Sequence, residues 1–222
     1  MIIPIDIRHV LRSDSSREEY ARVMQALQTC LRSCNEAWLR RHGEPAENLT
    51  LSRVRDGVAE LNMDHVFKPD SHETDDSLAL KAILDCMVEI NRAFLCAYRC
   101  QPLYDCGARY ARTDDWRPMP ALIQSRRGDC KSLGPARCAE LLEDGVPVMM
   151  VHRWAKRKHD DNANHKFRFD GHWEGHMRIC AICGQPEGDG GTDFHILLMV
   201  DGKEFEDPSK ILGMTAANAA EY

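Results

Sequence analysis

The chain has 222 residues, 43% of them hydrophobic, and a formal net charge of −6. A chain of this length can bury a substantial core as one domain, or as one domain with an appended helical part. The acidic balance argues against general binding of nucleic acid, and no apolar run approaches the ~20 residues that span a bilayer. The N-terminus lacks the basic flank and cleavage site of a secretory signal. We therefore expect a globular protein with neither nucleic acid nor membrane as partner.

A long helix is predicted near the N-terminus, after a short extended segment at residues 1–12. Ser16 and Glu19 stand at capping-box spacing, and an apolar periodicity of three to four follows them. Gly43 and Pro45 supply the signals that end this helix.

Two further segments continue this N-terminal part. Residues 50–67 form a shorter amphipathic stretch, and residues 77–98 are apolar on more than one face, which is typical of a helix at the centre of a core. Together the three segments predict a helical layer over residues 1–103 that packs on the rest of the chain.

The ten cysteines do not match a secreted disulfide scaffold, because the chain is long and has a core-forming pattern. We expect a reducing compartment. Cys30 and Cys34 are one helical turn apart, as are Cys96 and Cys100. A four-thiolate metal site, disulfides between the two helices, and small apolar packing residues are the alternatives, of which we favour packing.

Cys130 lies at a predicted helix start. Gly128 and Asp129 precede it, and a helical pattern follows until Asp144-Gly145. The first turn of a helix has unpartnered N–H groups and the positive end of the macrodipole, which favour a thiolate. This predicts a nucleophilic Cys130. Residues 146–151 predict the buried strand on which this helix packs.

A base and an orienting group are predicted on a following hairpin. Residues 194–207 indicate two strands joined by a tight Asp201-Gly202 turn. His195 opens the first strand and Asp207 closes the second, so the hairpin brings the two side chains together. Cys130, His195 and Asp207 thereby follow the logic of a catalytic triad.

Four segments occur in one order, namely Trp116–Pro120, Gly128–Leu133, Phe194–Ile196 and Glu206–Met214. They resemble the transglutaminase-like cysteine hydrolase superfamily, and within it the small proteins encoded among tailed-phage structural genes. The resemblance covers residues 104–214. It implies an α+β fold with a papain-like or transglutaminase-like core, in which a catalytic helix packs on a small antiparallel sheet.

By the same resemblance, Cys130 is the nucleophile, His195 the general base and acid, and Asp207 the orienting carboxylate. The reaction is amide or peptide hydrolysis, or transamidation, on a protein or peptide substrate that includes phage structural proteins. Backbone N–H groups at the helix start hold the oxyanion, with Gln124 as a further donor. Trp116 walls the cleft or belongs to the core.

The alternative is a non-enzymatic virion or tail-assembly protein that retains the fold. Either reading places the chain in the cytoplasm of a bacterial host, or in the virion.

Residues 155–191 interrupt the family pattern with a Cys/His-rich flap, and residues 215–222 form a tail. Cys180 and Cys183 present two thiolates at C-x-x-C spacing, which His172 and His176 complete as a structural zinc site. His159 and His165 are alternative ligands. The other readings are two idle thiols and a redox pair. No organic cofactor is expected.

Overall fold

The computed structural model describes residues 2–11, 16–46, 49–55, 58–63, 73–113, 115–155 and 193–215. Within these ranges the chain is a mixed α/β protein with small sheets. The elements of the N-terminal part are β1 (Ile2–Asp6), η1 (Arg8–Leu11), α1 (Arg17–His42), β2 (Thr50–Arg55), β3 (Val58–Asn62) and α2 (Glu73–Ala97). The remaining elements are β4 (Arg109–Tyr110), α3 (Met119–Ser125), β5 (Arg127–Gly128), α4 (Cys130–Glu143), β6 (Val148–Ala155), β7 (Asp193–Val200), β8 (Glu204–Glu206) and α5 (Pro208–Ile211).

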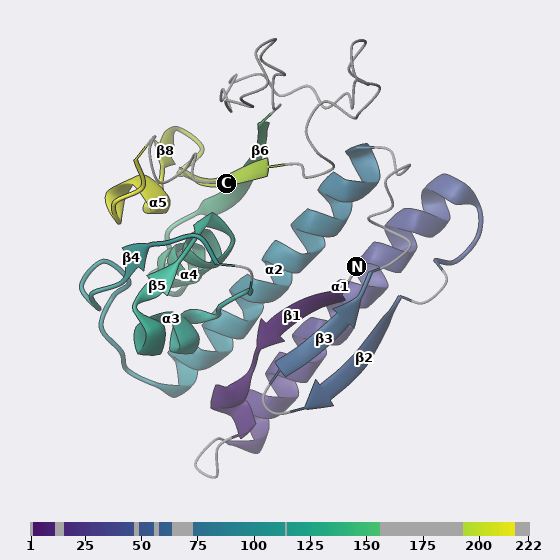
Figure 1. The fold of residues 1–222 in the computed structure, drawn as a ribbon, viewed down its shortest axis with the longest axis horizontal. Coiled ribbons are helices and arrows are strands. Elements are labelled where there is room, and N and C mark those ends of the chain that lie inside the picture. The colour runs from purple at the N-terminus through teal and green to yellow at the C-terminus, as the bar shows by residue number, and fades with distance from the viewer. Residues whose placement is uncertain are drawn as a thin grey trace, which may run out of the picture.

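Helix α2 lies in the middle of the molecule. It packs against α1 on one side and α4 on the other. In Figure 1 the strands β1, β3 and β2 lie across α1 and α2, whereas α3, α4, β4 and β5 lie beyond α2. The prediction of a central helix over residues 77–98 is confirmed, with a start four residues earlier at Glu73.

The caps of α1 are those predicted from the sequence. Ser16 is the N-cap, and its hydroxyl accepts a hydrogen bond of 3.0 Å from the Glu19 N–H. Gly43 has φ of 76° and donates its N–H to the Leu39 carbonyl. Glycine takes this left-handed conformation without the penalty that a Cβ would bring.

The described part of the segment predicted over residues 50–67 forms the antiparallel strands β2 and β3, so the prediction that it belongs to a helical layer is wrong. β3 pairs with both β1 and β2, and its burial alternates, with Ala59 and Leu61 buried between half-buried neighbours. The apolar residues Val54, Val58 and Leu61 are spaced by four and three, which imitates a helix. Pairing with β1, from the far N-terminus, decides for strands, and that long-range contact overrides the local pattern.

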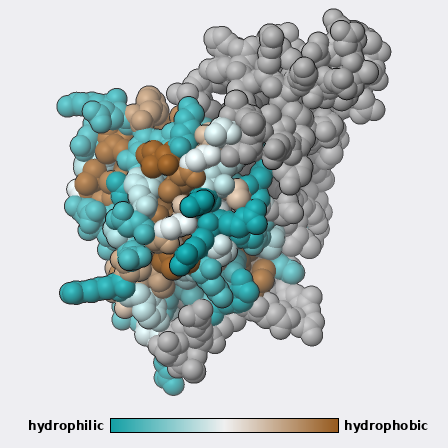
Figure 2. All heavy atoms as spheres, turned by 60° about the vertical axis from the view of Figure 1, so that its left-hand side comes forward, coloured by the Kyte–Doolittle hydropathy of each residue, from teal (hydrophilic) through white to brown (hydrophobic). Residues whose placement is uncertain are grey.

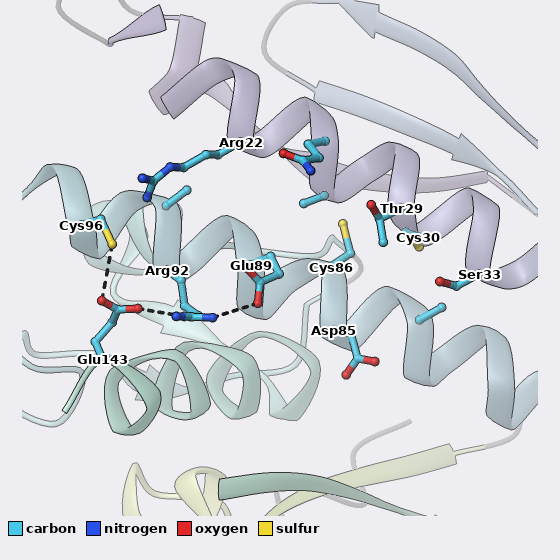
Figure 3. Close-up of a pocket in the computed structure, with 14 residues that line it drawn as sticks. Arg22, Thr29, Cys30, Ser33, Asp85, Cys86, Glu89, Arg92, Cys96 and Glu143 are labelled. Atoms are coloured by element: carbon cyan, nitrogen blue, oxygen red, sulfur yellow. Dashed lines mark hydrogen bonds and ion pairs between the residues drawn. The ribbon is translucent and has the colours of Figure 1, made fainter. Parts of the chain in front are cut away.

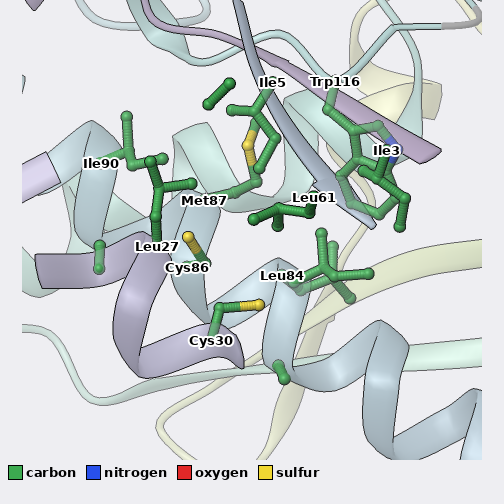
Figure 4. Close-up of a cluster of buried hydrophobic side chains, with 14 of the residues drawn as sticks. Ile3, Ile5, Leu27, Cys30, Leu61, Leu84, Cys86, Met87, Ile90 and Trp116 are labelled. Atoms are coloured by element: carbon green, nitrogen blue, oxygen red, sulfur yellow. The ribbon is translucent and has the colours of Figure 1, made fainter. Parts of the chain in front are cut away.

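The largest buried cluster joins the two halves of the chain. Figure 4 shows side chains of β1, β3, α1 and α2 packed together, with Trp116 at one side. Ile196 of β7 also belongs to this cluster. The backbone links the halves too, since Asp6 donates to the Trp116 carbonyl and Trp116 to the Pro4 carbonyl, both at 3.3 Å.

The C-terminal part contains the predicted helix and hairpin. β6, β7 and β8 form an antiparallel sheet in that order, and α4 packs on it. Asp201 and Gly202 have φ of 50° and 66°, the left-handed pair that a two-residue hairpin turn requires. The predicted hairpin is confirmed. The finer assignment to a papain-like core stays a prediction.

The surface around this part is mixed in character. Figure 2 shows hydrophobic groups standing between hydrophilic ones on the face that Figure 1 has at its left. Phe205 of β8 and Ile211 of α5 are each more than half exposed. Single exposed apolar side chains of this kind are ordinary on protein surfaces.

Candidate active site

Cys130 is the first residue of α4, as predicted. Asp129 before it is the N-cap residue, with extended backbone, and the residue as a whole is only 5% exposed. The Cys130 side chain is half-buried against the main cluster. The main-chain N–H groups of Lys131 and Ile196 both donate toward its sulfur. Because Ile196 follows His195 directly, this contact brings the predicted nucleophile to the start of β7.

A glycine allows α4 to approach β7 this closely. A Cβ built on Gly134 would lie 2.6 Å from Cγ2 of Ile196, which is shorter than a van der Waals contact between two carbon atoms and would be a steric clash. Gly134 is one helical turn after Cys130, on the same face of α4. Contact between the Gly134 backbone and Ile196 therefore sets the height of Cys130 above the strand that carries His195.

The predicted His–Asp pair is confirmed. His195 Nε2 lies 3.0 Å from Asp207 Oδ2, and the two side chains are 17% and 13% exposed. Because Nε2 contacts the carboxylate, Nδ1 is the ring nitrogen that can accept a proton. Burial raises the pKa of Asp207, but hydrogen bonds from His195 and from the Lys210 N–H outweigh it and leave the pKa below its usual value. Asp207 is thus a carboxylate at neutral pH.

The surroundings of the Cys130 sulfur act against the predicted thiolate. Burial, followed by the Asp129 carboxylate, raises the pKa of Cys130 to about 12. The Lys131 ammonium and the two N–H donors act in the opposite direction without cancelling this rise. The helix N-terminus favours a thiolate, but desolvation and the neighbouring carboxylate, which the prediction did not include, oppose it. Both causes favour the neutral thiol over the thiolate.

A buried ion pair flanks Cys130 in the chain. Lys131 Nζ donates to Asp129 Oδ2 and to the Thr113 carbonyl, and the two charged side chains are 11% and 8% exposed. The Thr113 N–H also donates to Asp129 Oδ2, at 3.2 Å. Sequence reasoning assigned no role to either residue. The available signal was two opposite charges on both sides of the predicted nucleophile.

Trp116 and Gln124 lie in different environments. Trp116 is 7% exposed and belongs to the main hydrophobic cluster, so its indole fills the core, which was one of the two predicted alternatives. Gln124 is exposed near the end of α3. Its place in an oxyanion hole stays a prediction.

The two cysteine pairs of the N-terminal part do not come together. Cys30 and Cys34 are buried, and the Cys30 thiol contacts those of Cys34 and Cys86. Cys96 is exposed, and its thiol lies 3.4 Å from Glu143 Oε2. Figure 3 shows Cys30 and Cys86 along a groove of about 480 Å³ between α1 and α2, with Cys96 farther along α2. This arrangement matches packing at Cys30 and Cys34.

The predicted zinc ligands Cys180, Cys183, His172 and His176, with the alternatives His159 and His165, lie outside the described residues, so the zinc site stays a prediction. Among the residues that the structure describes, no group of three or more His, Cys, Asp or Glu side chains is placed to hold a metal ion. None of the described helices combines the length and the apolar character needed to cross a bilayer.

Comparisons with family models, curated proteins and solved structures found no match to this chain.

Proposed function

We propose that this chain is a thiol acyl-transfer enzyme of the transglutaminase-like type, with Cys130, His195 and Asp207 as its triad. The observation that carries the proposal is the 3.0 Å contact between His195 Nε2 and Asp207 Oδ2, one residue away from the Ile196 N–H that faces the Cys130 sulfur. The three side chains come from separate places in the fold and carry the functional groups that covalent catalysis by a thiol requires.

The neutral thiol sets the order of proton transfers. Nε2–H of His195 donates to Asp207, which fixes the tautomer with a free lone pair on Nδ1. His195 takes the thiol proton as the sulfur attacks a carboxamide or peptide carbonyl. The proton then passes to the leaving nitrogen as the C–N bond breaks, and a thioester remains on Cys130. Asp207 stabilises the imidazolium that exists between these two steps.

The oxyanion of the tetrahedral intermediate would be held by main-chain N–H groups at the start of α4. N–H groups at a helix start lie at the positive end of the helix dipole, which favours a negative charge. Gln124 is proposed as a second donor. Water completes hydrolysis of the thioester, and an amine completes transamidation.

The proposal extends to the surroundings of the reaction. The substrate is a protein or peptide, with phage structural proteins as candidates, and the free thiols of the described residues suit a reducing compartment such as the host cytoplasm. A structural zinc on Cys180 and Cys183 would order the segment between β6 and β7, without taking part in the chemistry.

The test is selective alkylation. Wild-type protein and His195→Ala are treated with iodoacetamide at pH 7, and the Cys130 peptide is quantified by mass spectrometry. We expect alkylation of Cys130 to slow on the order of a hundredfold in the variant, since general-base help is lost. Alkylation of exposed Cys96 is the internal reference and should not change. Equal Cys130 rates in both proteins would contradict the proposal.

A second candidate, a virion or tail-assembly protein without catalysis, is favoured by the burial of Cys130 against the main cluster and by the Asp129 carboxylate beside it, which both act against a thiolate. Cys130→Ala distinguishes the two. If particle assembly and infectivity are unchanged at equal protein stability, the structural role is correct. If they are lost, the thiol is needed.

A further inference from the structure

Glu206 is the last residue of β8, and Asp207 follows it as the N-cap of α5. The two side chains face different neighbours. Glu206 reaches back to α4, where its Oε1 lies 2.9 Å from Arg137 Nε. Asp207 reaches His195. The residue beside the orienting carboxylate is therefore tied to the helix that carries Cys130.

Arg137 stands about two helical turns after Cys130, on a similar face of α4. The ion pair between Arg137 and Glu206 therefore connects the helix that carries Cys130 to the residue that precedes Asp207. β8 has three residues and pairs with one strand among those that the structure describes, so that ladder alone holds it weakly. A side-chain link to α4 adds a constraint at the position where Asp207 must be placed.

Other groups fix this arginine. The Tyr104 hydroxyl donates to the same Glu206 oxygen, and the guanidinium carbon of Arg137 lies 4.9 Å from the centroid of the Tyr104 ring. Arg137 Nη1 also donates to Glu140 Oε2 at 3.1 Å, and the other oxygen of Glu140 accepts the Leu103 N–H. Burial and the Glu206 carboxylate raise the pKa of Tyr104, which keeps its hydroxyl as a donor.

This link is more than a surface ion pair. Arg137 and Glu206 are 20% and 21% exposed, and Glu140 is 8% exposed. Exposed pairs contribute little, whereas a network with a fixed guanidinium holds a defined geometry. We propose that Arg137 and Glu206 are positioning residues that hold Asp207 in line with His195 and Cys130, an inference that rests on the proposed function.

The experiment measures the rate of Cys130 alkylation between pH 6 and 10 in Arg137→Gln and Glu206→Gln. We expect the rate at pH 7 to fall between about tenfold and a hundredfold, the cost of a misplaced catalytic group. Loss of the His195–Asp207 contact leaves the imidazole misaligned, so a larger share of the alkylation should depend on the thiolate that forms at high pH. Tyr104→Phe removes one hydrogen bond and should cause a smaller loss.

Arg92→Gln is the matched control. Arg92 Nε pairs with Glu143 Oε1 at 2.8 Å, at the far end of α4 and away from β8. Its loss should leave both the rate and the pH profile of Cys130 unchanged. If Arg92→Gln and Arg137→Gln slow alkylation equally, the effect belongs to α4 in general and the positioning role is wrong.

The same substitutions in an Asp207→Ala background separate positioning from stability. If Arg137 acts through Asp207, Arg137→Gln adds no further loss once Asp207 is gone. An equal loss in both backgrounds, or wild-type rates in Arg137→Gln and Glu206→Gln, would overturn the inference. If His195→Ala itself has no effect on Cys130, the proposed function fails first, and that outcome is read from a different variant.

Discussion

Asp207 holds His195 Nε2 at 3.0 Å with one carboxylate oxygen and accepts the Lys210 N–H at 3.1 Å with the other. The second contact is the N-cap of α5, which begins at Pro208. One side chain therefore both ends the β7–β8 hairpin and orients the imidazole. The conformation that caps the helix is the one that presents Oδ2 to His195.

The two roles of Asp207 can be separated by substitution. Asp207→Ser keeps an N-cap oxygen but does not reach His195, whereas Asp207→Ala loses both contacts. We expect both variants to slow Cys130 alkylation at pH 7 to a similar extent, on the order of a hundredfold. Asp207→Ala should in addition be about 1 kcal/mol less stable than Asp207→Ser, because only the alanine variant lacks the cap. Equal stability of the two variants would show that the cap contributes nothing.

Acid titration gives a second reading of Asp207. Its pKa in the folded protein is lowered, so the stability that it contributes is present above the unfolded pKa of about 3.9 and is lost as the pH falls through the folded value. Chemical denaturation of wild type and Asp207→Ser between pH 6 and 2 measures this. The difference in unfolding free energy should shrink below pH 4, and a constant difference would contradict the assignment.

Local signals in the sequence predicted a large part of this arrangement. The Ser16 cap, the Asp201-Gly202 turn and the helix start at Cys130 each depend on a few adjacent residues, so their chemistry is legible before folding. The His195–Asp207 pair followed from the hairpin, because a tight turn brings the beginning of its first strand near the end of its second.

Features that depend on distant contacts could not be predicted in this way. β3 is a strand because it pairs with β1, which precedes α1 in the chain. The raised pKa of Cys130 depends on burial, and the ion pair between Arg137 and Glu206 joins residues far apart in the chain. Nothing in the spacing of these residues encodes that they meet.

The buried pair beside Cys130 predicts two opposite effects on its thiol. Asp129 raises the pKa of Cys130 and Lys131 lowers it. Asp129→Asn should therefore lower the thiol pKa, and Lys131→Met should raise it. Each substitution also leaves a buried charge without its partner, which costs about 3–5 kcal/mol of stability. The pH dependence of Cys130 alkylation above pH 7 distinguishes them. Unchanged thiol pKa values in both variants would show that burial alone sets the pKa, and shifts in the same direction would contradict the opposite roles of the two charges.

Thiol reactivity should separate into clear groups along the described chain. Cys96 is exposed and should react with an aromatic disulfide reagent in the first, fast phase of labelling. The substitution Cys96→Ser should remove that phase. Cys30, Cys34, Cys86 and Cys138 are buried, and burial raises the pKa of Cys138 to about 12, so they should react only on unfolding. Mass spectrometry of labelled peptides at low denaturant checks this, and early labelling of Cys86 would contradict close packing of α1 on α2.

The contact between Gly134 and Ile196 makes the sharpest prediction about geometry. Alanine in a helix interior normally stabilises by about 0.5–1 kcal/mol relative to glycine. Here the new Cβ would lie 2.6 Å from Ile196 Cγ2, so we expect Gly134→Ala to lower stability by about 1–3 kcal/mol as α4 moves away from β7. That movement separates Cys130 from the start of β7, and alkylation at pH 7 should slow with it.

Ile196→Ala removes the clashing methyl group and supplies the rescue for this helix–strand contact. Alone it leaves a cavity in a fully buried position and should destabilise the protein by about 2–5 kcal/mol. Combined with Gly134→Ala it should cost less than the sum of the two single changes, because the new Cβ fills part of the space that Ile196 vacates. Thermal denaturation and the Cys130 alkylation rate of all four proteins complete the cycle. Strict additivity in both measurements would mean that α4 is not seated on β7 through this contact, and that another feature sets the distance between Cys130 and His195.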